Sequence, residues 1–515
     1  MEKRQMANLR ALLHSNDTTN VLLGLQLLET FQLEQVFLTE VFFIAYFADN
    51  YEQEEQLVAQ QMYQKLTNET LHHQVAYYAS QFYDKQGVLL ELDSNELFDT
   101  IDRTSFIKIY LKTYPYHPQN VLHILLKNGL DMTQFEFVQQ ITKFPLYAKW
   151  FGLSADKYHQ YFPSLTKSHI NKNDVKVLQQ PIEILKSLKE LSVEGNDLKE
   201  FPTSLLTCSH LQKLEIQGSQ FTTLPEAIAT LQNLEEIMIQ NSTLKALPEC
   251  IGQLSKLRQL TLGSNQLQCL PNTITQLAQL SHLHLPENQL EALPHHLENL
   301  QNLRVLNLQQ NNLQDLPPTL GQLSQLIYLN LDHNRLQALP PEIGQLQKLT
   351  HLYVDHNRLN TLPDTLSDLD QLKTLHLDYN QFTQLPQSLF SLHHLEFLSF
   401  NHNRLKQFPE APVALHQLSE LQLADNGLNY LPDFIFDIPQ LATLNFQNNL
   451  LTKLPDQLKT LKVHCLDLSH NLLENFPAHL VNTQHLEKLH LTGNPIYPVK
   501  IKRLRQQLPQ VEIIF

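Results

Sequence analysis

A 23-residue period runs through the sequence from Leu188 onward, and it constrains the fold more than any other feature. A polar residue closes each LxxLxLxxN stretch and marks the register. Twelve of the thirteen intervals between successive markers are equal, and the remaining one is shorter by a single position. A register held over fourteen repeats predicts a stack of similar coils, which grows along one axis. The markers are Asn196, Ser219, Ser242, Asn265, Asn288, Asn311, Asn334, Asn357, Asn380, Asn403, Asn426, Asn449, Asn471 and Asn494.

Each repeat has a pattern that predicts one coil. Leucines alternate with polar residues in the LxL segment, which is the period of a short strand with one buried face. The chain then turns at the marker asparagine. The LPxxIxxL segment follows, in which proline cannot extend a sheet and the spaced apolar residues suit a helical or 3₁₀ turn on the opposite side.

The marker asparagine recurs at the same place in each coil, so we expect its side chains to form a ladder through the stack. A carboxamide offers two donors and an acceptor to buried backbone groups. Ser219 and Ser242 offer less, so we expect the second and third repeats to be the least tightly specified. The expected structural ladder includes Asn265, Asn288, Asn311, Asn334, Asn357, Asn380 and Asn403.

These motifs resemble the leucine-rich repeat family over residues 188–515. The 23-residue form LxxLxLxxNxLxxLPxxIxxL is similar to the intracellular Ras-group type, found in adaptors that bind small GTPases and in the repeat arrays of Roc-COR proteins. The resemblance implies an α/β fold class: a curved solenoid with a parallel sheet on its concave side. It also implies that the concave face carries the function.

The remaining third of the chain has a different pattern. Residues 1–163 show helical apolar spacing and predict an all-α domain, and the opening NLRALLHSNDTTNVLLGLQLLET is similar to a HEAT-type helical pair. We expect residues 164–187 to form a linker, up to residue 174, and then the N-terminal cap of the solenoid. Repeats then occupy residues 188–497. Residues 498–515 resemble the C-terminal caps of intracellular family members.

Charge and composition exclude several function classes. A formal net charge of −15 argues against a nucleic-acid or anionic-membrane surface. The longest apolar run, residues 41–48, is far shorter than the roughly 20 residues of a membrane span. The four cysteines have neither metal-ligand spacing nor clustered pairs, and residues 1–20 lack the apolar core of a signal peptide. We therefore expect a cytoplasmic protein.

The sequence lacks recognisable catalytic motifs. It has no GxxxxGK[ST], no kinase HRD or DFG, and no GxGxxG, HExxH, CxxC or GxSxG. A Roc-type GTPase domain is therefore missing. All four cysteines lie in the repeats, so none of them is available as the nucleophile of a separate cysteine-dependent ubiquitin ligase domain. We expect no enzyme activity and no cofactor. The alternative is an active site in the helical third, where His72, His73 and His117 are the candidates, with the repeats as substrate receptor.

The outward strand positions carry the candidate binding residues. The last outward position of the strand holds Tyr353 and His376, and the outward position two residues earlier holds Tyr328, His351 and Phe397. Two residues after the strand come Asp332, Asp355 and Asp378. Exposed aromatic groups on a rigid scaffold are typical of protein interaction sites, so these eight residues predict a partner-binding patch. The resemblance to the Ras-group type implies that the partner is a signalling protein such as a small GTPase.

Two alternatives to this patch remain open. Recently duplicated repeats could have copied the Asp-His-Asn motif by inheritance alone. A metal site using Asp332, His333, Asp355 and His356 has suitable ligand types, but consecutive strand residues face opposite ways and no supporting second layer of groups is recognisable. We therefore expect no metal ion.

Overall fold

The computed structural model describes residues 167–170, 188–194, 198–406, 408, 415–476 and 485–515, together with Leu23 and Ala59. The contacts divide the chain into two units, Met1–Leu165 and Thr166–Phe515. The helical domain expected in residues 1–163, with its HEAT-like segment, lies outside the described residues except at those two isolated positions.

The second unit is built on one parallel sheet of sixteen strands, arranged in the order of the sequence. Neighbouring strands pair with a shift of one repeat, so that Leu329 lies opposite Leu352. The strands are β1 (Lys167–Ile170), β2 (Glu190–Val193), β3 (Lys213–Gln217), β4 (Glu236–Gln240), β5 (Gln259–Thr261), β6 (His282–His284), β7 (Val305–Asn307), β8 (Tyr328–Asn330), β9 (His351–Tyr353), β10 (Thr374–His376), β11 (Phe397–Ser399), β12 (Glu420–Gln422), β13 (Thr443–Asn445), β14 (Cys465–Asp467), β15 (Lys488–His490) and β16 (Glu512–Ile514).

Short 3₁₀ turns form the other side of most coils. All but η10 begin directly after a proline, whose fixed φ suits an extended entry and whose missing N–H prevents it from extending the sheet. The turns are η6 (Thr203–Thr207), η7 (Glu226–Thr230), η8 (Glu249–Gln253), η9 (Asn272–Gln276), η10 (Leu297–Asn299), η11 (Pro318–Gln322), η12 (Pro341–Gln345), η13 (Asp364–Asp368), η14 (Gln387–Ser391), η15 (Asp433–Asp437) and η16 (Asp456–Thr460).

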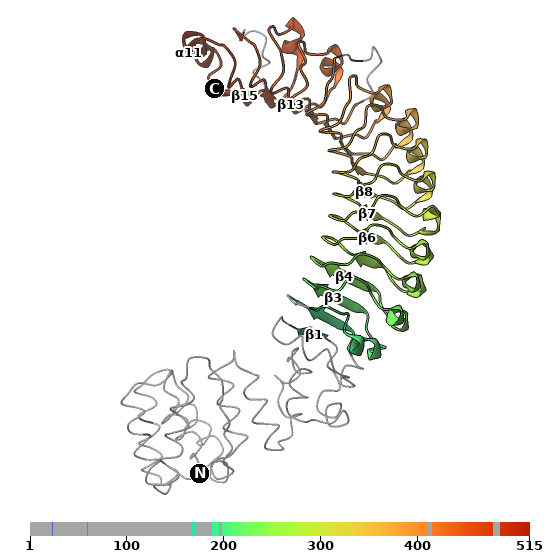
Figure 1. Cartoon of the computed structure of the whole chain (residues 1–515). Helices are drawn as coiled ribbons and strands as arrows, with labels where there is room; N and C mark the ends of the chain where they lie inside the picture. Colours follow the sequence, from blue (N-terminus) through green and yellow to red (C-terminus); the bar gives the residue numbers. More distant parts are fainter. Residues whose placement is uncertain are drawn as a thin grey trace, which may run out of the picture. The chain divides into compact units, whose positions relative to one another are not determined.

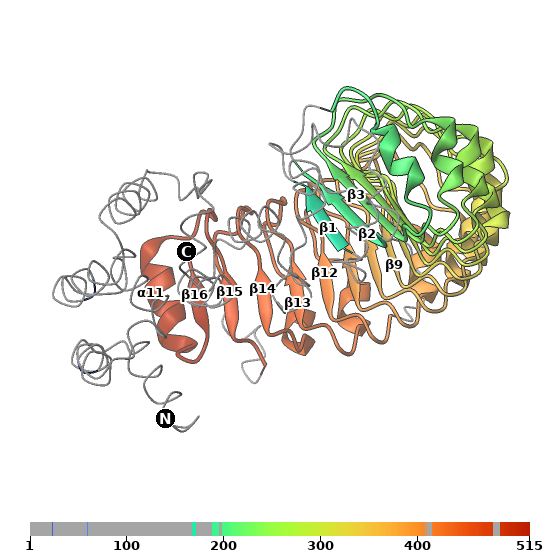
Figure 2. The ribbon, with the colours of Figure 1, turned by 90° about the horizontal axis from the view of Figure 1, so that it is seen from below.

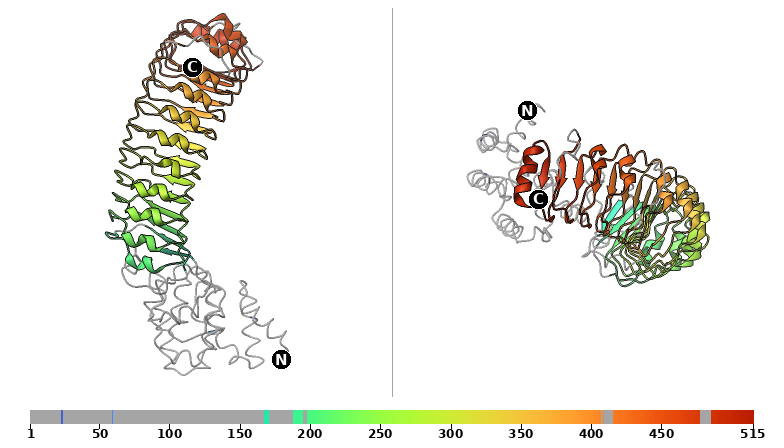
Figure 3. Two further views of the ribbon diagram at one scale, coloured as in Figure 1. Left: turned by 90° about the vertical axis from the view of Figure 1, so that its right-hand side faces the viewer. Right: turned by 90° about the horizontal axis from the view of Figure 1, so that it is seen from above.

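The second unit is a curved, open solenoid, as the resemblance implied. The strands line the inner, concave side of the arc and the 3₁₀ turns lie on its outer side (Figure 1). Seen from the outer side, successive turns stack above one another (Figure 3). Because the strands lie on the inner side of the arc, successive coils are closer together at the strands than at the turns. The predicted parallel sheet is therefore confirmed.

Leucines fill the space between the sheet and the turns. In each short strand the side chain of the middle residue points into the core between the sheet and the turns, so Leu329 and Leu352 have no exposed surface. The flanking residues face the concave side. Phenylalanines replace leucines at some inward positions, and Phe382 and Phe400 pack edge to face with their centroids 5.1 Å apart. The core is thus one continuous column that every coil extends.

The sheet begins one coil earlier than the sequence analysis predicted. Strand β1 lies inside residues 164–174, which we expected to be a linker, and pairs in parallel with β2 through Lys167 opposite Glu190. The paired residues of the two strands are therefore one full repeat apart in the sequence. The apolar pattern is broken there because Ser168 stands opposite Leu191, and this break hid the strand. Asn173, one repeat before the first marker Asn196, was the available signal.

The C-terminal segment closes the stack with a helix and a strand. Helix α11 (Pro498–Gln507) has proline at its first turn, and its Leu504 is buried. The chain then returns as β16, which pairs with β15. Figure 2 shows α11 beside this last strand. The segment therefore both extends the sheet and covers the last layer of leucines.

Replacing Leu329 by Asp tests the buried column. The side chain has no exposed surface, so an unpaired carboxylate there should lower the free energy of unfolding by several kcal/mol. Urea unfolding followed by circular dichroism would measure the loss. The matched control is Ile327→Asp, because Ile327 is 37% exposed and should tolerate the charge. Equal losses in the two variants would contradict the inward placement of Leu329.

Candidate functional site

The marker asparagines join neighbouring coils through their side chains. The Nδ2 group of Asn357 donates to the backbone oxygens of Leu331, Val354 and Asp355 at 3.0, 3.2 and 3.1 Å. Its Oδ1 accepts from the backbone N–H of Leu336 at 2.9 Å. One side chain thus satisfies four backbone groups from two coils.

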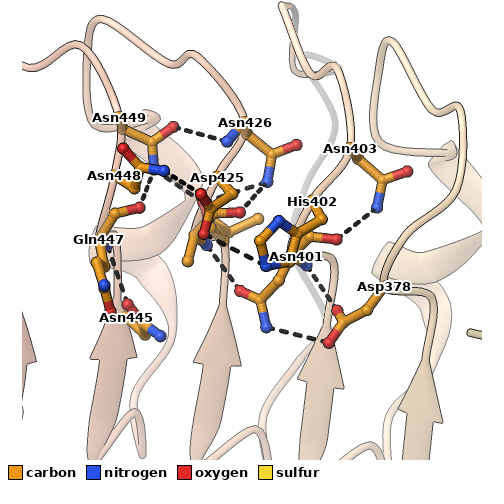
Figure 4. Close-up of polar contacts among 12 residues, drawn as sticks. Asp378, Asn401, His402, Asn403, Asp425, Asn426, Asn445, Gln447, Asn448 and Asn449 are labelled. Carbon is orange, nitrogen blue, oxygen red and sulfur yellow. Dashed lines mark hydrogen bonds and ion pairs between the residues drawn. The ribbon is translucent and has the colours of Figure 1, made fainter. Parts of the chain in front are cut away.

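This arrangement runs through most of the solenoid. Figure 4 shows part of it: Asn449 donates to the backbone oxygen of Gln447 and accepts from the backbone N–H of Asn426, and Asn403 donates to the backbone oxygen of Asn401. Ser219 and Ser242 make a smaller version in the early repeats, where the Ser219 hydroxyl donates to the Ser242 hydroxyl at 2.9 Å. Side-chain donation to the preceding coil is made by Asn265, Asn288, Asn311, Asn334, Asn357, Asn380, Asn403, Asn426, Asn449, Asn471 and Asn494.

The residue before the marker adopts a left-handed backbone, with φ between 51 and 56° at eleven positions that are not glycine. This conformation is uncommon for such residues. It directs the side chains of His333, His356, Tyr379 and His402 along one edge of the sheet, where their rings stack with centroids 3.9, 4.0 and 3.9 Å apart. We call these four residues the edge stack.

The aspartates after the strands form a second ladder. The Oδ1 atom of Asp332 accepts from the backbone N–H of Asp355 at 2.7 Å, and Asp355 accepts from Asp378 at 2.6 Å. Asp378 accepts in the same way from Asn401, and Asn401 from Ala424, at 2.6 and 2.7 Å (Figure 4 shows Asp378 and Asn401). Each side chain therefore holds the corresponding backbone group of the next coil.

In other coils, the backbone N–H two residues after the strand donates to a side chain of the same coil. Asn307 accepts from Gln309 at 3.0 Å, and Asn330 accepts from Asp332 at 2.9 Å. A neutral amide can therefore serve in either arrangement. The bonding role of these aspartates was not foreseen from the sequence, although the amide Asn401 in the same column was a possible signal.

The carboxylates lie in an environment that disfavours their charge. The pKa of Asp332 is raised to about 7, first by burial and second by the nearby Asp355 carboxylate, against the hydrogen bond from the Asp355 backbone. Burial also raises the pKa of Asp378. His376 Nδ1 lies 3.4 Å from Asp355 Oδ2. Burial lowers the pKa of His376, but the hydrogen bond to Asp355 and the surrounding carboxylates outweigh it, so the net direction is upward.

The predicted aromatic residues form a row of rings across β8 to β11. The centroids are 5.3 Å apart for Tyr328 and Tyr353, 4.8 Å for Tyr353 and His376, and 4.7 Å for His376 and Phe397. We call these four residues the aromatic row. Each of them is partly exposed. His351 lies beside the row, 6.5 Å from Tyr353.

The structure brings all eight predicted patch residues to four neighbouring coils. The five rings face the concave side from β8 to β11, and the three carboxylates follow β8, β9 and β10. The acids lie next to the rings, as the contact between His376 and Asp355 indicates. His333 and His356 of the edge stack were considered in the sequence analysis as ligand types for a metal ion. The ring contacts of the stack depend on the left-handed backbone, which the sequence did not predict.

Four other candidate features are a metal site, the cysteine thiols, a membrane-spanning helix and the histidines proposed for an enzymatic site. The described side chains include no cluster of three or more histidine, cysteine, aspartate or glutamate groups suited to a metal ion. Cys208, Cys250, Cys269 and Cys465 are free thiols. Within the described ranges, none of the helices has the length and apolar character that a bilayer span requires. His72, His73 and His117, the candidates for an enzymatic site, lie outside the described residues.

Replacing Asn357 by Ala should be costly although it removes only a small side chain. It leaves the Leu336 N–H and three carbonyl groups without the partner shown above, which should lower the free energy of unfolding by about 2–4 kcal/mol. Urea unfolding would measure the change. The exposed Asn360 provides the control, because Asn360→Ala should have little effect; equal effects would show that the ladder contributes nothing.

Asp332 should make stability depend on pH. Its raised pKa means that, between about pH 4 and pH 7, the folded protein holds a proton that the unfolded chain has released. The free energy of unfolding should therefore fall as pH rises through this window. Asp332→Asn should flatten this part of the curve, measured as the urea midpoint against pH. An unchanged slope, with the exposed Asp364→Asn as the reference variant, would contradict the assignment.

The matches to leucine-rich repeat family models lie within the solenoid. Models described as leucine-rich repeat region and leucine rich repeat match residues 302–396, and residues 209–267, 232–290 and 370–428. A search of curated proteins gives no match. A solved leucine-rich repeat protein of Leptospira interrogans is 32% identical, with a TM-score of 0.66, and the match covers 76% of this chain and 98% of that one.

A more distant solved structure supports the fold alone. The Toll–Spätzle complex of Drosophila contains a chain that is 23% identical, with a TM-score of 0.58, and the match covers 67% of this chain and 49% of that chain. The repeat-family models, the Leptospira relative and the solenoid with its asparagine ladder agree with one another. The chain belongs to the leucine-rich repeat family.

Proposed function

We propose that the protein is a non-catalytic scaffold that binds a protein partner on the concave face of its repeats. Leucine-rich repeat domains bind proteins, and this chain belongs to that family. The observation that carries the proposal is the aromatic row, four partly exposed rings on adjacent strands of a rigid sheet. Aromatic side chains supply large contact area at low conformational cost.

The pattern of variation along the sheet supports a binding role for the row. The inward strand positions keep leucine, as at Leu329, Leu352 and Leu375, because each fills the same space. The outward positions change from coil to coil, from Val305 in β7 to Tyr328 in β8. Copying of whole repeats would have preserved both, so inheritance alone does not account for the row.

The resemblance supports the proposed class of partner, and the free thiols support the proposed cellular compartment. The 23-residue repeat resembles the Ras-group type, so we propose a signalling adaptor with a small GTPase as the candidate partner; this is an analogy of family. Four free thiols, of which Cys269 is exposed, suit a reducing compartment such as the cytoplasm.

The double variant Tyr353→Ala with Phe397→Ala tests the binding surface. Interface aromatic residues commonly contribute about 2 kcal/mol or more each, so partner capture from the native organism's lysate should fall by at least about tenfold. Quantitative pull-down with the full chain would measure it. Because these rings also stack on His376, we expect a modest fall in melting temperature, and the assay should be run well below it.

The control is Tyr430→Ala with Tyr497→Ala. Both tyrosines are exposed, by 47% and 67%, and neither lies in the aromatic row. This pair should leave capture unchanged. If both double variants capture the partner as well as the wild type, binding occurs elsewhere and the proposal is wrong.

A further inference from the structure

Three columns of positions on the concave face hold acids but no lysine or arginine over a long stretch of the sheet, whereas the residue directly before the strand is a cation at Arg258, Arg304 and Lys373. In the ten described strands β5 to β14, neither the two outward positions nor the position two residues after the strand holds lysine or arginine. The same positions hold five acids, Asp332, Asp355, Asp378, Glu420 and Asp467. Cations occur at the rims instead, for example Arg335 and Arg358, which follow marker asparagines and are exposed.

Three of these acids lie directly beside the aromatic row. Asp355 pairs with His376, a member of the row, at 3.4 Å. The phenol of Tyr353 is also close to carboxylates: its pKa is raised by burial first, then by Tyr328, Asp332 and Asp355. At the far end of the row, Phe397 lies opposite Glu420 of β12. The row of rings and the column of carboxylates therefore lie side by side in one surface.

The fold does not require the negative charges of Asp332, Asp355 and Asp378. Asn401 makes the same bond to the following coil with an amide, and other coils satisfy the equivalent N–H internally, as at Asn307. Ionised carboxylates in this partly buried setting repel one another. In the described structure, Asp355 has a histidine as its ion-pair partner, with no lysine or arginine in that role. The surface thus presents negative charge without a compensating lysine or arginine.

We infer that the partner segment seated on β8 to β12 is basic and bears arginine side chains. The inference rests on the proposed function and deepens it. A guanidinium group is planar, binds carboxylates through two parallel hydrogen bonds and also stacks on aromatic rings. The acid-aromatic surface offers both kinds of contact, and no lysine or arginine at these positions of the ten described strands would repel an arginine-bearing segment.

Protonation should modulate this recognition with a definite sign. Asp332 has a pKa of about 7, and the titratable groups that face it are Asp355 and His376, with Tyr353 and Asp378 nearby. An arginine favours ionised Asp332, so binding should release a proton and tighten as pH rises through about 7. Below that pH, neutral Asp332 attracts arginine less, and His376, whose pKa is raised by Asp355 and the neighbouring carboxylates against the effect of burial, repels arginine when it is protonated.

The test uses the full chain with a synthetic probe. The probe is an extended peptide that alternates arginine and serine, and its neutral counterpart carries citrulline in place of arginine. The site variant is Asp332→Asn with Asp355→Asn, which keeps the backbone-accepting oxygen, as Asn401 does. The control is Asp364→Asn with Asp368→Asn, which removes the same charge from the 3₁₀ turn η13 on the convex side. Calorimetric titration measures the affinity.

We expect the wild type and the convex-side control to bind the arginine peptide alike, and the site variant to bind about tenfold more weakly. The citrulline peptide should bind weakly to all three proteins. The wild-type affinity should increase from about pH 6 to about pH 8, and Asp332→Asn should reduce that increase. Equal affinity in the site variant and the control, or equal affinity for both peptides, would overturn the inference.

These outcomes separate the two proposals. If partner capture depends on Tyr353 and Phe397 while the peptide titrations show no role for Asp332 and Asp355, the binding surface is retained and its basic partner is rejected. If peptide binding depends on the aspartates while capture is indifferent to the aromatic pair, the arginine-binding surface stands and the proposed use of the aromatic row fails.

Discussion

Satisfying buried backbone groups at every turn is the constraint on which this structure depends. Each coil leaves its strand and reverses direction beside the leucine core, where unpaired N–H and C=O groups would be costly. The marker asparagine supplies partners for both coils at once, as Asn357 does for Leu336 of the preceding coil and Val354 of its own coil. A side chain that must meet the preceding coil fixes the spacing between coils, so the period stays constant over almost the whole array.

Because the inward leucines and the marker asparagine set the period, the outward positions can vary and can serve recognition. Because adjacent strands pair without a change of register, a given outward position recurs at strand spacing, about 4.8 Å. Tyr353 and His376 occupy one such position, and their ring centroids are 4.8 Å apart. Tyr328 and Phe397 occupy the other outward position and contact this pair diagonally, with centroids 5.3 and 4.7 Å away. The edge stack is closer, at 3.9–4.0 Å, since its left-handed backbone aligns the rings. The solenoid thus converts a column in the sequence into a continuous surface.

The features that depend on the period could be predicted from the sequence, and those that depend on particular neighbours could not. The inward direction of Leu329 and the outward direction of Tyr353 follow from alternation within a strand. Strand β1 was missed because Ser168 breaks the leucine pattern, although its backbone pairs normally with β2. The bond from the Asp355 backbone to Asp332 was missed for another reason: a carboxylate after a strand has several possible donors, and only the distance between coils selects one.

Asp332 and Asp355 show how structural and binding roles can be separated in such a surface. Their Oδ1 atoms bind the backbone of the following coil, and Asn401 makes the same kind of bond with an amide. A negative charge strengthens that bond but is not required for it, and burial together with the Asp355 carboxylate makes the charge of Asp332 unfavourable on balance, as its raised pKa shows. A charge that lowers stability and that the fold does not require is typical of sites whose favourable interaction is made with another molecule. The position of the negative charges along the sheet therefore marks where the compensating cation of a partner would lie.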